Sequence, residues 1–137
     1  MLANLLGHFE EILIPMRLTD PNPRFPHPAI LHTASGSHSL ALRVASDFTS
    51  RLRGLMLAPP LALDEALLLT RCSSVHTAFM RQVIDVIYLD RSDRVVRCVP
   101  MLKPWRSSAA WGAAHVLELA AGSISRCGIT SGDRLQR

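Results

Sequence analysis

The sequence predicts a mainly β fold of the α+β kind, in which a small antiparallel sheet closes partly into a barrel and carries one or two short helices. Short apolar or alternating segments, which are typical of strands, are separated by turn residues along most of the chain. The 137 residues are 48% hydrophobic, which is enough for one buried core without disulfides or a metal. Closure into a barrel is favoured because it hides the edges of such a sheet.

The first 39 residues are expected to lie outside this domain. In residues 1–14 the apolar side chains share one helical face, which predicts a short amphipathic helix or an extended start. Residues 15–39 are predicted to be a linker, because prolines are concentrated there and disfavour regular structure. Residues 40–137 then form a single β-rich domain. Without a basic leader or a bilayer-length apolar segment, the chain is expected to be cytoplasmic and not membrane-spanning.

The elements of the domain follow from hydrophobic periodicity and turn signals. After the first strand, Ser46 or Asp47 can cap a short helix that Gly54 would end. Ser123 can cap one helical turn that Gly128 would end. Strand patterns occupy residues 40–45, 66–70, 74–80, 84–89, 94–99 and 115–119, with a last strand at Leu135. Loops are expected at 90–93, as a hairpin, and at 100–111.

Composition narrows the classes of partner. The net charge of +4 is small beside the basic stripe of a nucleic-acid-binding protein, and aromatic residues are only 5% of the chain. No nucleic-acid partner is therefore expected. The three cysteines lack zinc-site spacing and are expected to be free thiols, with a Cys98–Cys127 pair as the alternative in an exported protein. No cofactor is predicted.

Several ordered blocks of the chain resemble a known family. The blocks are residues 51–56, 74–80, 84–90, 103–105, 116–122 and 128–135. Together they resemble the bacterial and archaeal family called domain of unknown function 192. The resemblance implies a compact, mostly antiparallel β-fold with short helices and no established activity. Many relatives are exported, so a place at the bacterial envelope is expected if that tendency applies here.

Residues within or beside these blocks are expected to have structural roles. They are Arg51, Arg53, Gly54, Met56, Glu118, Gly122, Gly132 and Asp133. Asp85 lies in a strand that is expected to be buried on both faces, so its carboxylate needs a partner or an opening. The candidate partners are Arg51, Arg53 and Arg81.

The leading functional hypothesis is a non-catalytic binding or accessory module. Its ligand would be a small polar molecule or a protein partner, recognised around one opening of the barrel. The candidate ligand-binding residues combine charged, sulfur-bearing and aromatic side chains: His76, Met80, Arg81, Asp85, Lys103, Trp105 and Trp111.

Two alternatives centre on Cys72 and His76. With Met80 they provide soft or borderline ligands at spacings of four, which suit Cu(I) on a helix but are too far apart to share one ion on a strand. A nucleophilic enzyme would instead use Cys72 as nucleophile and His76 as base, with Asp85 or Glu118 orienting the imidazole.

Overall fold

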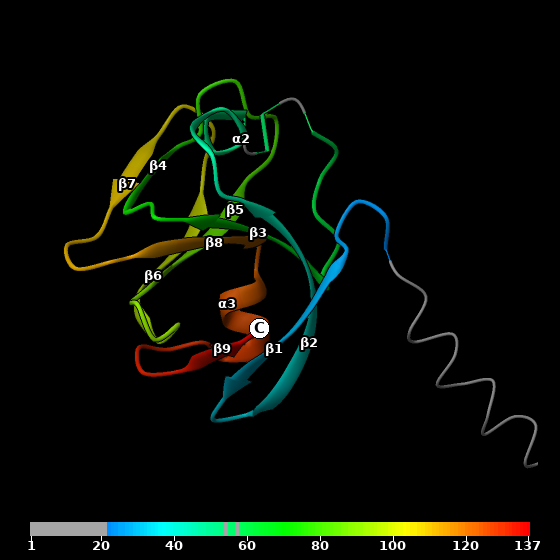
Figure 1. The fold of residues 1–137 in the computed structure, drawn as a ribbon, viewed down its shortest axis with the longest axis vertical. Coiled ribbons are helices and arrows are strands. Elements are labelled where there is room, and N and C mark those ends of the chain that lie inside the picture. The colour runs from blue at the N-terminus through cyan, green and yellow to red at the C-terminus, as the bar shows by residue number, and fades with distance from the viewer. Residues whose placement is uncertain (1–21, 54, 57) are drawn as a thin grey trace, which may run out of the picture.

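The computed structural model describes residues 22–53, 55–56 and 58–137. The helix predicted within residues 1–14 lies outside this range. The described residues form nine strands and two short helices (Figure 1). In chain order these are β1 (His27–Thr33), β2 (Gly36–Ala45), α2 (Phe48–Arg53), β3 (Glu65–Thr70), β4 (Ser74–His76), β5 (Ile84–Leu89), β6 (Val95–Leu102), β7 (Ser107–Ala109), β8 (His115–Ala120), α3 (Ser123–Cys127) and β9 (Arg134–Gln136).

Seven of the strands form one curled sheet in the order β6-β5-β8-β3-β2-β1-β9, and β4 pairs separately with β7. Backbone hydrogen bonds connect the two ends of this order, including those from Leu135 N–H to Asp93 O (2.9 Å) and from Val95 N–H to Asp133 O (2.7 Å). These bonds cover strand edges that would otherwise be exposed. The predicted partly closed, mainly β fold is confirmed.

One strand pair departs from the predicted antiparallel arrangement. β2 and β3 run parallel, with Leu42 opposite Ala66, while the other pairs of the large sheet are antiparallel. A parallel pair needs a crossover connection, and the chain between the two strands contains α2. Asp47 caps this helix, as predicted, because its Oδ1 accepts a hydrogen bond from Ser50 N–H at 2.8 Å.

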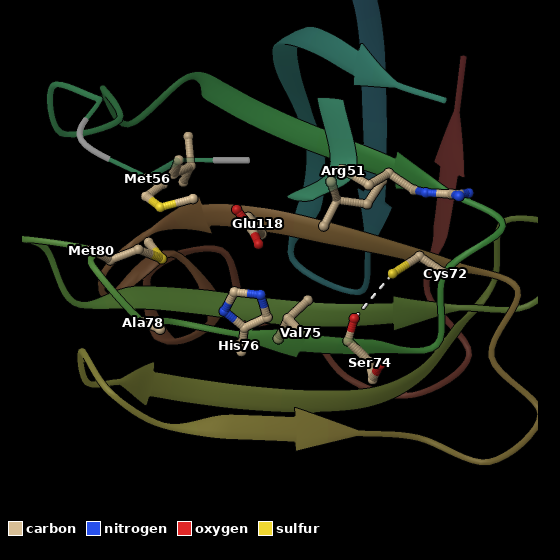
Figure 2. Close-up of a pocket in the computed structure, with 11 residues that line it drawn as sticks. Arg51, Met56, Cys72, Ser74, Val75, His76, Ala78, Met80 and Glu118 are labelled. Atoms are coloured by element: carbon tan, nitrogen blue, oxygen red, sulfur yellow. Dashed lines mark hydrogen bonds between the residues drawn. The ribbon is translucent and has the colours of Figure 1, made fainter. Parts of the chain in front are cut away.

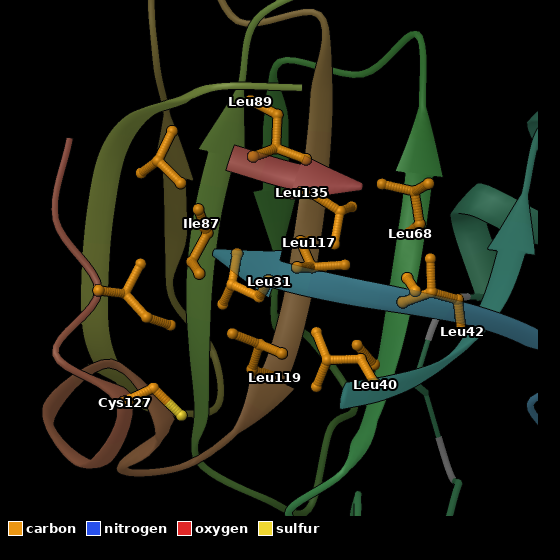
Figure 3. Close-up of a cluster of buried hydrophobic side chains, with 14 residues drawn as sticks. Leu31, Leu40, Leu42, Leu68, Ile87, Leu89, Leu117, Leu119, Cys127 and Leu135 are labelled. Carbon is orange, nitrogen blue, oxygen red and sulfur yellow. The ribbon is translucent and has the colours of Figure 1, made fainter. Parts of the chain in front are cut away.

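The sheet separates two clusters of buried side chains. Leu117 and Leu119 of β8 face the first cluster, which lies inside the curl of the sheet with α3 (Figures 1 and 3). Val116 and Ala120 face the second, which also contains Leu55 and side chains of the β4 segment. The central strands β3, β5 and β8 are therefore buried on both faces, which explains their nearly continuous apolar sequences.

The prediction that residues 15–39 form a linker is wrong for residues 27–39. They form β1 and the start of β2, which pair along seven positions. Pro28 is tolerated because β9 pairs only with residues 30–32, so the Pro28 end of β1 has a neighbour on one side alone. Phe25, just before β1, is 1% exposed and has the guanidinium groups of Arg24 and Arg43 over its ring.

Other local predictions also change. The predicted strand 74–80 ends at His76, and the loop predicted at 100–111 contains the end of β6 and all of β7. Ser123 does not cap α3, because the capping residue is Gly122 with a left-handed φ of 86°. Gly128 does end this helix, as predicted, with φ of 65°.

Candidate functional site

A small pocket lies over the second cluster, between the β4 segment and the end of α2 (Figure 2). Its volume is about 60 Å³. A few water molecules or one small functional group fill such a space, whereas sites for drug-sized ligands have several hundred Å³. Apolar, sulfur-bearing and polar side chains line it together: Arg51, Leu55, Met56, Leu69, Cys72, Ser74, Val75, His76, Ala78, Met80 and Glu118.

Glu118 provides a buried carboxyl group at the floor of this pocket. The residue is 4% exposed, and its Oε2 has no hydrogen-bond partner among the described residues. Burial raises the pKa of Glu118 to about 7, although the positive charge of Arg43 acts in the opposite direction. Buried polar atoms are nearly always hydrogen-bonded in proteins, so the unpaired carboxyl oxygen sets this pocket apart from an ordinary packed interior.

The methionines Met56 and Met80 lie at the same end of the pocket as Glu118. In the view of Figure 2 both thioethers and the ring of His76 project toward the same end of the pocket lining as the carboxyl group, and Cys72 lies toward the other end. Met80 is 6% exposed, whereas His76 is exposed to solvent. The pocket therefore combines a buried floor with one imidazole that solvent reaches.

A tight turn directs Met80 inward. Met80 N–H donates to Thr77 O at 3.2 Å, and between them Phe79 has a left-handed φ of 61°. An aromatic residue adopts this backbone region only when its surroundings impose it. The hydroxyl of Thr77 connects the turn to the next loop, because it donates to Lys103 O (2.6 Å) and accepts from Arg106 N–H (2.8 Å).

We expect Thr77→Val to lower the free energy of unfolding by about 1–2 kcal/mol, because two backbone groups lose their partner in a site that valine fills equally well. Urea denaturation measures this loss. Thr130→Val, in an exposed loop position, is the matched control and should leave stability unchanged. Equal stabilities of the two variants would show that the Thr77 hydroxyl does not hold the turn.

Asp85 does not belong to this pocket. It lies next to Val86 of the second cluster and beside Leu119 of the first, so its side chain points to the opposite face of the sheet from Glu118. Its two carboxylate oxygens accept hydrogen bonds from Met101 N–H (2.9 Å) and Ile124 N–H (2.7 Å). The predicted pairing with arginine is wrong for Arg51, which donates to the carbonyl oxygens of Thr70 and Arg71.

The other predicted arginine partners do not change this result. No ion pair joins Arg81 to Asp85 in the described part of the chain, and Arg81 is exposed. The side chain of Arg53 and all of Gly54 lie outside the described residues. A single opening that combines Asp85 with His76 and Met80, as predicted, is therefore not formed.

The remaining predicted ligand-binding residues lie on exposed loops outside the pocket lining. Trp105 is 61% exposed and contacts the ring of Phe79 edge to face, with centroids 4.8 Å apart. Lys103 is in the same loop and is exposed. Trp111 is fully exposed in the turn after β7. The structure thus brings together only His76 and Met80 of the predicted binding set.

The arrangement of Cys72 does not match a nucleophile with its base. Its thiol donates to Ser74 O at 3.0 Å, and Figure 2 shows it separated from His76 along the pocket. All three cysteines are free. Within the described residues there is no group of three or more His, Cys, Asp or Glu side chains that could hold a metal ion; methionine is not one of these residue types.

From the sequence, Glu118 and Met56 were expected to have structural roles, with Glu118 also an alternative orienting acid for His76, and neither was expected among the ligand-binding residues. The signal for Glu118 was available, because it is the one charged residue among the otherwise apolar residues 116–120. No comparable signal marked Met56, since its place beside Met80 depends on how α2 packs over the sheet. In the part of the chain that the structure describes, no helix is long and apolar enough to cross a membrane.

The sequence of the chain matches a family model and several related proteins. The model of domain of unknown function 192, "Uncharacterized ACR", matches residues 30–137. A UPF0127 protein of Thermococcus sibiricus is 36% identical over 99 residues, which cover 69% of this chain and 64% of that protein. UPF0127 protein PF1050 of Pyrococcus furiosus is 37% identical over 101 residues, which cover 71% of this chain and 86% of that protein. The chain thus spans less than two thirds of the Thermococcus protein.

Two solved bacterial structures have the same fold. A protein of unknown function from Novosphingobium aromaticivorans matches with a TM-score of 0.78 and 22% identity, over 85% of this chain and 91% of that chain. A protein proposed to be a transcription regulator, from Sinorhizobium meliloti, matches with a TM-score of 0.74 and 28% identity, over 80% of this chain and 91% of that chain. The similar proteins are therefore both archaeal and bacterial.

Proposed function

The chain belongs to the uncharacterised family of domain of unknown function 192, and from its geometry we propose that it is a binding module that takes up a small ligand group in the pocket over Glu118. The ligand is a small polar molecule or a single side chain of a protein partner. The volume of about 60 Å³ supports a ligand group of this size.

The observation that carries this proposal is the unpaired Oε2 of Glu118. A carboxyl group that is 4% exposed and has an oxygen without a hydrogen-bond partner is costly for the folded protein. A ligand group that donates a hydrogen bond or carries positive charge would offset this cost. The apolar and sulfur-bearing walls would exclude water from that contact and strengthen it.

An enzymatic function has less support. The thiol of Cys72 is bonded to a backbone carbonyl, and Asp85 lies on the other face of the sheet. Glu118 Oε2 makes no hydrogen bond to His76. The groups that nucleophilic catalysis requires are thus not arranged as nucleophile, base and orienting acid.

Ligand screening by ¹H–¹⁵N NMR tests the proposal. Small amines, amides, amidines and alcohols are titrated into the protein, together with peptides that present such groups. We expect binding compounds to shift the amide signals of Val75, His76 and Met80, and Glu118→Gln to weaken cationic ligands about tenfold or more because the charge-assisted hydrogen bond is lost.

Glu65→Gln is the matched control, since Glu65 is a half-buried glutamate of the same sheet that already bonds Asn22 and the Ala62 amide. It should leave these affinities unchanged. If no compound or peptide shifts the pocket signals, or if both glutamate variants bind as the wild type does, the proposed function is wrong.

A further inference from the structure

Four side chains of the pocket carry atoms that bind soft or borderline metal ions. Met56 and Met80 present thioethers, His76 an imidazole and Glu118 a carboxylate. They come from three separate parts of the chain: the segment after α2, the β4 segment and strand β8. Figure 2 shows these groups facing the same space at one end of the pocket. This set differs from the predicted Cys72, His76 and Met80, because Met56 takes the place of Cys72.

We propose that this pocket is a binding site for a soft monovalent cation, Cu(I), held by the thioethers of Met56 and Met80 and the imidazole of His76, with the carboxylate of Glu118 as counter-charge. The inference rests on the proposed function, since it names the ligand of the same pocket. Thioethers select Cu(I) over Mg²⁺, Ca²⁺ and Zn²⁺ because they are soft, uncharged donors.

Charge supports a monovalent ion. Two thioethers and one neutral imidazole contribute no net charge, so a single carboxylate balances a single positive charge. The unpaired Oε2 of Glu118 gains the partner that it lacks among the described residues. Two arginines must be considered in this charge balance. Arg51 lines the pocket, but its guanidinium donates to the carbonyl oxygens of Thr70 and Arg71 and points away from Glu118 (Figure 2). Arg43 acts on Glu118 electrostatically but does not line the pocket.

The size and access of the pocket also suit an ion. A volume of about 60 Å³ admits a metal ion, and the surrounding side chains leave Met80 6% exposed. His76 is exposed, so an ion can reach the site through its imidazole. The strained turn at Phe79 directs Met80 toward this space, which places one ligand before the ion arrives.

Methyl NMR with Ag(I), a redox-inert substitute for Cu(I), tests the site directly. The chain has five methionines, at positions 1, 16, 56, 80 and 101, so ¹³C-methyl labelling gives separate signals. We expect the Met56 and Met80 signals to shift on titration with Ag(I), whereas the signal of Met101, which is 54% exposed and outside the pocket, should not move. Silver bound only at Cys98 or Cys127 should leave these signals in place, because neither thiol lines the pocket. Cys72 does line it and is free, so the titration is run on Cys72→Ser.

Affinity for Cu(I) is then measured by competition with a chromogenic chelator under anaerobic, reducing conditions. Loss of a residue that only hydrogen-bonds a metal ligand already weakens metal binding about 10–100-fold. Loss of a ligand itself, in Met56→Leu or Met80→Leu, should therefore lower the affinity for Cu(I) about tenfold or more. Met101→Leu is the matched control and should bind as the wild type does.

The proposal is overturned if the Met56 and Met80 methyl signals stay fixed at every ratio of Ag(I), or if Met56→Leu and Met80→Leu bind Cu(I) as tightly as Met101→Leu. Either result could occur together with binding of an organic compound that depends on Glu118. The copper proposal would then be wrong, and the proposed function would still be supported. If neither the ions nor the organic compounds bind at the pocket, both fail.

Discussion

Replacing Asp85 with alanine is expected to lower the free energy of unfolding by about 3–5 kcal/mol. Asp85 is completely buried, and its carboxylate accepts hydrogen bonds from the backbone of Met101 in β6 and of Ile124 in α3. Alanine would leave both N–H groups without a partner inside the protein. Because the two bonds join the edge strand β6 and helix α3 to the central strand β5, their loss should loosen all three elements together.

Chemical denaturation with Asp90→Ala as a matched control measures this effect. Asp90 also accepts two backbone N–H bonds, from Ser92 (2.8 Å) and Arg94 (3.0 Å), but in an exposed hairpin loop where water can replace it. Its loss should cost about 1 kcal/mol or less. Hydrogen exchange should also accelerate at the amides of Met101 and Ile124 in Asp85→Ala. Equal losses for the two variants would contradict the role assigned to Asp85.

Most strands of the fold could be predicted from the sequence, because hydrophobic periodicity is a local property. Residues 84–89 and 115–119 were predicted as strands and lie in β5 and β8. The strand β1 was missed because the prolines of residues 15–28 argue locally against strands. Pro28 is tolerated because β9 pairs with the other end of β1, and this pairing involves residues far apart in the sequence.

The candidate site was harder to predict, because the register between paired strands decides which side chains face the pocket. Asp85 and Glu118 both interrupt apolar strands, and sequence alone does not say which face each one occupies. The pairing of Val86 with Glu118 and of Asp85 with Leu119 puts the two acids on opposite faces. A shift of one residue in the pairing of these two strands would put both acids on the same face, which is why a local pattern could not separate the two roles.

The two buried acids therefore illustrate different solutions for a carboxyl group inside a sheet. Asp85 is satisfied by backbone donors that the fold itself supplies. Glu118 keeps an oxygen that no described residue satisfies. The first arrangement stabilises the fold, and the second makes the protein pay a cost that a ligand can remove. This contrast is the physical reason to look for function at Glu118 and for stability at Asp85.

The ionisation of Glu118 is expected to make the chelator-treated protein about 3 kcal/mol less stable at pH 8 than near pH 4.5. Burial raises the pKa of Glu118 from 4.5 to about 7. Between these pH values the folded protein holds a proton that the unfolded chain releases. The free energy of unfolding therefore falls as the pH rises through this window and levels off above pH 7.

Glu118→Gln replaces the ionisable carboxyl group with a neutral amide of about the same size. The free energy of unfolding of this variant should therefore not fall over this pH window, and at pH 8 it should exceed that of the wild type. The charged or titratable groups around Glu118 are Arg43, which acts on its pKa, Tyr88, on whose pKa Glu118 acts, and Arg51, Cys72 and His76 of the pocket lining. Of these, only an imidazole ordinarily titrates within the window. The decline must therefore persist in His76→Asn, measured by urea denaturation at each pH. Parallel curves for the wild type and Glu118→Gln would show that the carboxyl group is not held neutral by burial, and the cost that a ligand is proposed to remove would then be absent.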